Sequence, residues 1–267
     1  MQQSLCETRV VKLQNSLAKN DIDLAVLLKP QNVAYLTGFN PVIQSHPVMV
    51  VIPKQGQLIM LVSALRIAHA EKDSFVPSEQ MVLYGNWGSR RGIAKTALEA
   101  LVKVVKERGL AAKTVGVEYD HLPLQYSQQL EDLFPQAKFN DVSFLLAQQR
   151  MIKDEAEINL IRQAACIADG GMETALQFMK PGNTEIEVAV RTMQALQEAW
   201  LTNFPGTEAV DFGTPEGGCL NSLWCYCLSG QRMNYFAEIS TDKVIEPGEL
   251  TLSIIWTAMQ GYHAENE

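Results

Sequence analysis

Two long helices in tandem are the feature that most restricts how this chain can fold. Residues 154–179 and 184–200 carry apolar side chains at helical spacing, and each segment opens with a capping box, Asp154 with Glu157 and Thr184 with Glu187. Pro181-Gly182 stops the first helix. We expect the buried stripes to be Ile158, Ile161, Ala165, Ala168, Met172, Ala175 and Met179 on the first helix and Ile186, Val190, Met193 and Leu196 on the second. After Trp200 the pattern changes to strands and loops, with strand-like runs at 223–228, 250–256 and 261–267.

Helix and strand signals alternate before this pair. The expected elements are a helix around 10–17, a strand at 23–28, a short helix at 30–39 closed by Gly38, two β-rich runs at 47–53 and 57–62, a helix at 93–108, a strand at 114–118 and a helix at 124–133. The connection Lys54-Gln-Gly between the two β-rich runs indicates a hairpin. We therefore expect an α/β domain over residues 1–148 and a second, α+β domain over residues 151–267.

Charge and hydropathy exclude two classes of partner. The net charge is −8 and the pI is about 5.1, so the chain repels nucleic acid and anionic membranes. No apolar run approaches the roughly 18 residues that cross a bilayer. The first twelve residues are polar and lack the apolar core of a signal peptide, which predicts a cytoplasmic protein.

The five cysteines do not form a recognisable metal site. Cys225 and Cys227 are only two residues apart, whereas zinc sites usually place two or more residues between paired cysteines. We interpret the cysteines as buried, reduced thiols. The alternative is a nucleophilic cysteine at Cys219 or Cys225.

Five motifs resemble the creatinase and Xaa-Pro peptidase (prolidase, aminopeptidase P) superfamily, and they occur in the family's order. They are Asn32-Val-Ala-Tyr-Leu-Thr-Gly-Phe, Arg150-Met-Ile-Lys-Asp-Glu-Ala-Glu-Ile, Lys180-Pro-Gly-Asn-Thr-Glu-Ile-Glu, the run from Ser229-Gly through Asn234 to Thr241-Asp-Lys-Val-Ile-Glu-Pro-Gly-Glu-Leu, and Gly261-Tyr-His-Ala-Glu. The resemblance implies a creatinase-like N-terminal α/β domain and an incomplete pita-bread catalytic domain, truncated at Glu267 before the later strands. Because fold does not fix chemistry, the site residues need separate examination.

The resemblance implies a metal site that these residues do not reproduce. Metallopeptidases of the family hold two metal ions with two Asp, one His and two Glu, because an activated hydroxide needs anionic oxygen ligands around an open site. The two Asp positions correspond here to Ile254 and Glu265, and the substrate-side histidine to Ala237. We therefore expect no metal and no other cofactor.

Creatinase itself, which works without metal, offers a second pattern. It uses a histidine and two glutamates as general acids and bases, and one of those glutamates corresponds to Glu267. His263 lies two residues before Glu265 and hence on the same face of a regular strand, where it could replace the histidine missing at Ala237. We therefore take Glu267, Glu265 and His263 as candidate catalytic residues, while an ordinary strand histidine remains the alternative for His263.

Two features of the first domain indicate contacts between subunits. By resemblance, Arg66 could bind a substrate carboxylate across a dimer interface, although a solvated arginine is the alternative. Trp87, in an unusual loop, indicates an interdomain or intersubunit contact. The expected partners are a small-molecule or dipeptide-like substrate and a second copy of the chain.

Three functions stay open on this reading. They are a metal-independent C–N hydrolase of the creatinase kind, a proline-specific metallopeptidase relative that is weak or inactive in this form, and a non-catalytic binding module.

Overall fold

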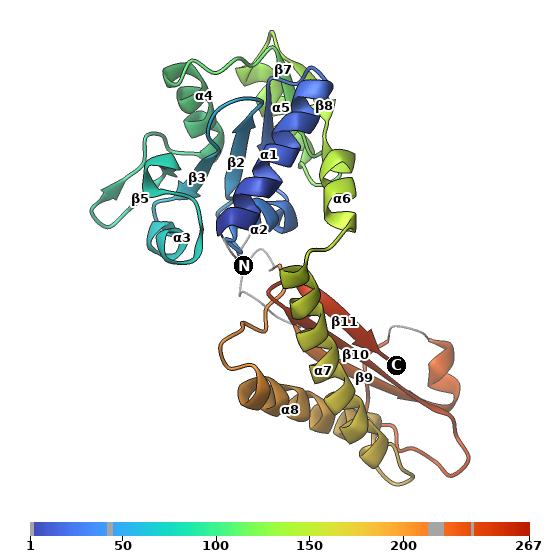
Figure 1. The fold of residues 1–267 in the computed structure, drawn as a ribbon. Helices are drawn as coiled ribbons and strands as arrows, with labels where there is room; N and C mark the ends of the chain where they lie inside the picture. The colour runs from blue at the N-terminus through green and yellow to red at the C-terminus, as the bar shows by residue number, and fades with distance from the viewer. Residues whose placement is uncertain (1–2, 42–44, 213–221, 236–237) are drawn as a thin grey trace. The chain divides into compact units, whose positions relative to one another are not determined.

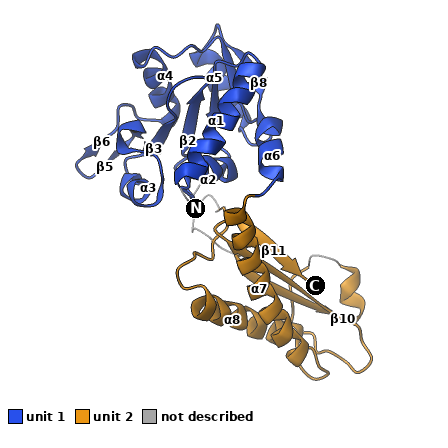
Figure 2. Cartoon of the chain, in the orientation of Figure 1, with its two compact units in different colours: residues 1–153, 214–216 blue, residues 154–213, 217–267 orange. Residues whose placement is uncertain are grey.

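The computed structural model describes residues 3–41, 45–212, 222–235 and 238–267 of the chain (Figure 1). The chain forms two compact units (Figure 2). Of the described residues, those up to Lys153 belong to the first unit and those from Asp154 onward to the second.

A six-stranded mixed sheet forms the centre of the first unit. Its order is β4-β3-β2-β1-β7-β8, in which β2 runs antiparallel to both neighbours and the other pairs are parallel. The strands are β1 (Leu24–Leu27), β2 (Met49–Pro53), β3 (Ile59–Ser63), β4 (Met81–Tyr84), β7 (Thr114–Val117) and β8 (Lys138–Asp141). The predicted hairpin around Lys54 is confirmed as the β2–β3 pair.

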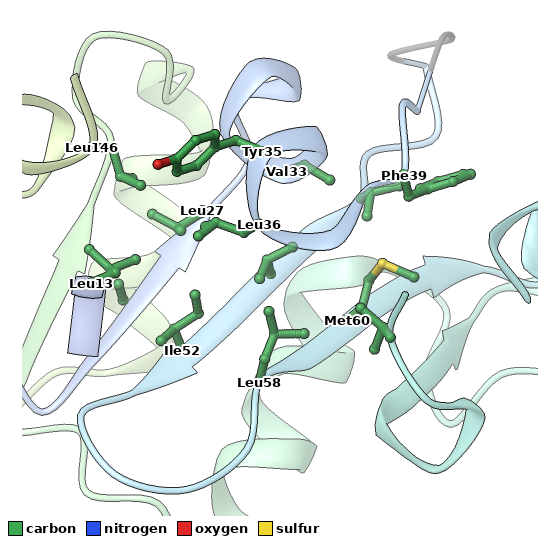
Figure 3. Close-up of a cluster of buried hydrophobic side chains, with 14 of the residues drawn as sticks. Leu13, Leu27, Val33, Tyr35, Leu36, Phe39, Ile52, Leu58, Met60 and Leu146 are labelled. Carbon is green, nitrogen blue, oxygen red and sulfur yellow. The ribbon is translucent and has the colours of Figure 1, made fainter. Parts of the chain in front are cut away.

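Helices cover both faces of this sheet because its strands are apolar on both sides. In β1, Ala25 and Leu27 belong to one core, and Leu24 and Val26 to the other. The first core lies under α1 (Gln3–Lys19), α2 (Pro30–Thr37), α3 (Ile67–Asp73) and α6 (Ser143–Met151), and Figure 3 shows part of it. The second lies under α4 (Ala97–Glu107) and α5 (Leu124–Leu133). The unit is a three-layer α/β domain, the class that the sequence predicted.

A small hairpin extends the chain after β4. Its strands are β5 (Asn86–Trp87) and β6 (Arg90–Arg91), which pair antiparallel. A short 3-10 turn, η1 (Ser78–Gln80), comes before β4.

The second unit consists of two helices on one face of a three-stranded antiparallel sheet. The elements are α7 (Glu155–Phe178), α8 (Glu185–Asn203), β9 (Leu223–Ser229), the 3-10 turn η2 (Gly230–Asn234), β10 (Thr251–Met259) and β11 (Tyr262–Asn266), with the strand order β11-β10-β9. Cys225, Cys227 and Ile255 of the sheet share one core with Ile167 of α7 and Leu196 of α8. This is the α+β arrangement that the sequence predicted.

Both predicted capping boxes are confirmed, but the predicted helix faces are wrong in part. Asp154 and Thr184 cap α7 and α8. On α8, however, Ile186 and Val190 are 47% and 50% exposed. The predicted core residues Ala168, Ala175 and Leu196 are buried. The other residues that face the core are Leu160, Ala164, Ile167 and Gly171 of α7 and Glu185, Val188, Ala189 and Thr192 of α8. Small side chains dominate these faces because they let the two helices approach each other closely.

Candidate functional site

Strand β11 presents two kinds of side chain to its two faces. Toward the helices, the Tyr262 hydroxyl donates to Glu157 of α7 at 2.8 Å, and the Asn266 amide donates to Asp169 at 2.7 Å. Because side chains alternate along a strand, His263 and Glu265 point to the opposite face. We call this opposite side of the β9–β10–β11 sheet, which α7 and α8 do not cover, the open face.

His263 on the open face is paired with a carboxylate. Its Nε2–H donates to Oδ1 of Asp211 at 2.8 Å. Asp211 belongs to the segment that follows α8, and backbone bonds hold this segment against the β10–β11 turn, from Gln260 N–H to Glu208 C=O and from Gly261 N–H to Val210 C=O. The donated hydrogen bond leaves Nδ1 of His263 as the nitrogen that can accept a proton.

The hydrogen bond between His263 and Asp211 shifts the pKa values of both side chains. The hydrogen bond to Asp211 raises the pKa of His263 above 6.5, although burial opposes the change. Burial raises the pKa of Asp211, but the hydrogen bonds from His263 and from the Phe212 backbone outweigh that effect and leave the pKa below 3.8. The pair therefore combines an ionised Asp211 carboxylate with an imidazole that is more basic than an isolated histidine.

Aromatic side chains line the middle of the open face. Trp224 and Tyr226 on β9 meet edge to face at 6.0 Å, and Tyr226 and Trp256 on β10 do so at 5.5 Å. The Trp256 indole N–H donates to Oε1 of Glu265. The aromatic row therefore fixes the orientation of one Glu265 oxygen.

A hollow of about 520 Å³ connects these groups. Its lining residues are Asp211, Trp256, Thr257, Ala258, His263, Ala264 and Glu265. An imidazole, two carboxylates and an indole ring thus surround one space, and the imidazole and carboxylates are groups that can exchange protons with a small polar molecule.

The predicted catalytic residues have different positions relative to this hollow. His263 and Glu265 both line it. Glu267 is exposed and directly follows the end of β11 at Asn266. Asp211 was not expected from the sequence, because nothing in its local spacing links it to His263. Ala237 and Cys219 lie outside the described residues.

Arg66 lies in the first unit, where it has local partners. Its guanidinium donates to the Pro41 carbonyl at 2.9 Å and approaches Nδ1 of His69 at 2.8 Å. Burial lowers the pKa of Arg66. Its proposed contact with a substrate carboxylate stays a prediction.

The cysteines of β9 are buried as expected, and their burial disfavours the nucleophilic alternative. Burial raises the pKa of Cys225 and raises that of Cys227 to about 12. Cys6 is also buried, whereas Cys166 is exposed, which corrects the expectation for that residue.

The described residues do not fit the two-metal site of the peptidases. Ile254 is buried on β10 and offers no donor atom, and no group of three or more His, Cys, Asp or Glu side chains with metal-binding geometry occurs within the described ranges.

Among the helices that the structure describes, none combines the length and the apolar character that a bilayer crossing needs.

Comparison with known proteins places the geometry in context. Residues 9–152 match the family model described as Creatinase/Prolidase N-terminal domain. The chain is 24% identical to the creatinase of a Bacillus strain over 97% of this chain and 58% of creatinase. It is 25% identical to an uncharacterized peptidase of Staphylococcus aureus over 77% of this chain and 54% of that peptidase.

Solved structures resemble the chain over nearly its whole length. The prolidase of Pyrococcus horikoshii superposes with a TM-score of 0.75 at 24% identity, covering 97% of this chain and 63% of that one. The Xaa-Pro dipeptidase of Bacillus anthracis superposes with a TM-score of 0.73 at 21% identity and the same coverage. The chain therefore spans less than two thirds of each of these relatives.

Proposed function

This chain belongs to the creatinase/Xaa-Pro peptidase, or pita-bread, superfamily, and from that premise we propose that its open face hydrolyses a C–N bond by general acid–base chemistry without metal. The observation that carries the proposal is the His263–Asp211 pair, which lies in one hollow with Glu265.

In the proposed reaction, His263 acts as the base. Its Nδ1 takes a proton from a water molecule, whose oxygen bonds to the carbon of the scissile C–N bond. Asp211 holds the imidazole through Nε2–H and stabilises the imidazolium that forms, as an orienting carboxylate does in other acid–base sites. The C–N bond then breaks, and the imidazolium returns its proton to the leaving nitrogen.

The glutamates have supporting roles in this proposal. One Glu265 oxygen accepts from Trp256, which leaves the other to accept a hydrogen bond from an N–H of the substrate. Glu267, which directly follows the same strand, is the second candidate acid. Small amide-like or dipeptide-like molecules match a hollow of about 520 Å³.

The experiment is a hydrolysis assay with two substrate classes, guanidino or ureido C–N compounds and Xaa-Pro dipeptides, with and without EDTA. His263→Gln and Asp211→Asn should each lower kcat by about 10²-fold or more. His46→Gln, in the first unit, is the matched control and should not change kcat.

Three results would reject the proposal. One is turnover that His263→Gln does not affect, and another is turnover that EDTA abolishes, which would favour a metallopeptidase. The third is a folded chain that binds these substrates without hydrolysing them, which would favour the binding module.

A further inference from the structure

The order of strands in the first unit reverses at β1. From β1 the chain adds β2, β3 and β4 on one side and later adds β7 and β8 on the other, and β1 and β7 are parallel neighbours. The helix after β1, α2, packs into the first core, whereas the helix after β7, α5, packs into the second. The two connections therefore leave toward opposite faces of the sheet. In open α/β sheets, small molecules bind in the crevice at the carboxyl ends of such a strand pair.

A cavity of about 220 Å³ lies at this crevice. Its lining includes Leu28, which directly follows β1, and His121, which lies between β7 and α5. The cavity is smaller than the roughly 300–1,000 Å³ of sites for drug-sized ligands, so it suits a single ring with one polar group. Its walls are mainly apolar and include Leu28, Pro30, Pro47, Val48 and Pro123.

Hydrogen bonds hold two walls of the cavity in place. The buried Glu118 carboxylate accepts from the backbone N–H of Leu28 at 2.6 Å and from that of Lys29 at 2.8 Å. On the other side, the Tyr84 hydroxyl donates to the Pro47 carbonyl at 2.8 Å. Because these walls are already ordered, a ligand does not have to offset the entropy of ordering them.

Two polar side chains of the lining, His121 and Tyr126, can donate to a ligand. Within the described ranges, neither the His121 ring nitrogens nor the Tyr126 hydroxyl forms a hydrogen bond. A neutral imidazole and a phenol offer one donor each. The cavity therefore combines apolar walls with two unused donors.

The charges around His121 favour an anion over a cation. Burial lowers the pKa of His121 below 6.5, the Lys29 ammonium lowers it further, and Asp120 opposes both effects. Lys29 is paired with Asp120 at 2.5 Å, yet its effect on His121 is the larger of the two. A carboxylate beside His121 thus meets a positive potential as well as the two donors.

We propose that this cavity is a second ligand site, which binds a small ring-bearing carboxylate. The ring packs against the proline and leucine walls, and the carboxylate accepts from the His121 ring N–H and the Tyr126 hydroxyl. All of these residues belong to the first unit. The inference therefore does not depend on the reaction proposed for His263.

Benzoate is the probe, and NMR titration of the full chain is the measurement. The chain has only four histidines, so the ring protons of His121 and His263 can be followed separately. Benzoate should bind with a Kd on the order of 1 mM, as expected for so small a ligand. It should also raise the pKa of His121, because a nearby anion stabilises the imidazolium. Benzamide, which is neutral, and acetate, which lacks the ring, should each bind at least about fivefold more weakly.

Two substitutions with matched controls test the contacts. Tyr126→Phe and His121→Leu should each weaken benzoate binding about tenfold, because each removes a hydrogen bond to a charged group. Tyr119→Phe, in the same connection between β7 and α5, and His263→Leu, in the second unit, should leave the Kd unchanged. Circular dichroism confirms that every variant is folded.

Several results would overturn the inference. They are the absence of a saturable shift of the His121 signals, equal affinity for benzoate and benzamide, and a Kd that neither Tyr126→Phe nor His121→Leu changes. Benzoate that shifts the His263 signals alone would also overturn it, because the ligand would then lie on the open face. Since no readout involves turnover, a chain that binds benzoate as described but hydrolyses nothing would reject the proposed reaction and leave this inference intact.

Discussion

His263 and Asp211 are 52 residues apart in the sequence, yet His263 Nε2 lies 2.8 Å from Oδ1 of Asp211. One residue belongs to β11 and the other to the segment after α8, so the bond ties that segment to the open face of the sheet. Its effect on ionisation can be measured directly.

Replacing Asp211 by Asn should lower the pKa of His263 toward 6.5, because the hydrogen bond to the carboxylate is the main cause of its raised value. An NMR titration of the His263 ring protons measures the shift. Glu198→Gln on the exposed face of α8 is the control and should leave the titration unchanged. A His263 titration identical in the two variants would contradict the pairing.

The same pair should make stability depend on pH. The raised pKa of His263 means that its contribution is complete below about pH 6.5 and is lost as the pH rises through the folded-state value. The lowered pKa of Asp211 means that its contribution is present above about pH 3.8 and is lost as the pH falls through its folded-state value. Stabilisation by the pair is therefore greatest between these limits. Because both side chains are partly exposed, we expect less than about 1 kcal/mol, measured as the difference in urea unfolding between the wild type and Asp211→Asn.

Glu185 should be the costliest carboxylate of the second unit to remove. It is fully buried at the start of α8 and accepts from the backbone N–H and hydroxyl groups of Ser229 and Thr241 and from Nε of Arg232. Glu185→Ala would leave these donors and the Arg232 charge without their acceptor, at a cost of about 3–5 kcal/mol in urea unfolding.

Glu187→Gln, two residues along the same helix, is the matched control. Glutamine retains the capping box with Thr184, so this change should cost less than about 1 kcal/mol.

Burial raises the pKa of Glu185, but the hydrogen bonds from Thr241, Ser229 and Arg232 outweigh it and lower the pKa below 4.5. Glu185 thus stabilises the fold above about pH 4.5, and this stability is lost as the pH falls through its folded-state value. Equal unfolding midpoints for Glu185→Ala and Glu187→Gln would contradict the stabilising role of the hydrogen bonds to Glu185.

Two adjacent glycines of α7 should respond oppositely to alanine. A Cβ at Gly171 would overlap Cδ2 of the buried Leu196 on α8, so Gly171→Ala should cost about 1–3 kcal/mol. At Gly170 the space is open, and Gly170→Ala should stabilise the helix by up to about 1 kcal/mol. Chemical unfolding of both variants measures whether each change raises or lowers the free energy of unfolding. A Gly171→Ala chain as stable as the Gly170→Ala chain would mean that α7 and α8 are not packed closely there.

Local sequence signals predicted much of the fold because local interactions produce those parts. The capping boxes at Asp154 and Thr184 need only residues three positions apart, and both helices begin where these boxes place them. The hairpin between β2 and β3 depends on a short connection and apolar runs on either side.

Helix faces and the candidate site depended on contacts that no local pattern contains. The interpretation of α8 followed its largest aliphatic residues, but Ile186 and Val190 are exposed, and the face with Ala189 and Leu196 is buried against α7 and β9. Strand alternation was sufficient to place His263 and Glu265 together. Asp211 joins them only through tertiary structure, which spacing in one sequence does not reveal.

The junction between the units should be the first site of proteolysis. Ile152 is 83% exposed and lies between α6 and the cap of α7. Brief trypsin treatment should cut after Arg150 or Lys153 and release a folded piece of about 150 residues. Mass spectrometry identifies the cut, and circular dichroism tests whether the piece is folded. Earlier cleavage inside β1, β2 or β3 would argue against a self-contained first domain.

We expect that this chain does not bind metal ions in stoichiometric amount. A dinuclear site needs carboxylates on both central strands, but the β10 position holds Ile254, which has no donor atom. We therefore expect elemental analysis after EDTA dialysis, Mn²⁺ reloading and gel filtration to give well below one metal ion per chain. The unfolding midpoint should be the same before and after EDTA, because a metal that binds only the folded chain would raise it. About two tightly retained Mn, Co or Zn ions per chain would overturn this account, since the ligands would then have to come from a different set of residues.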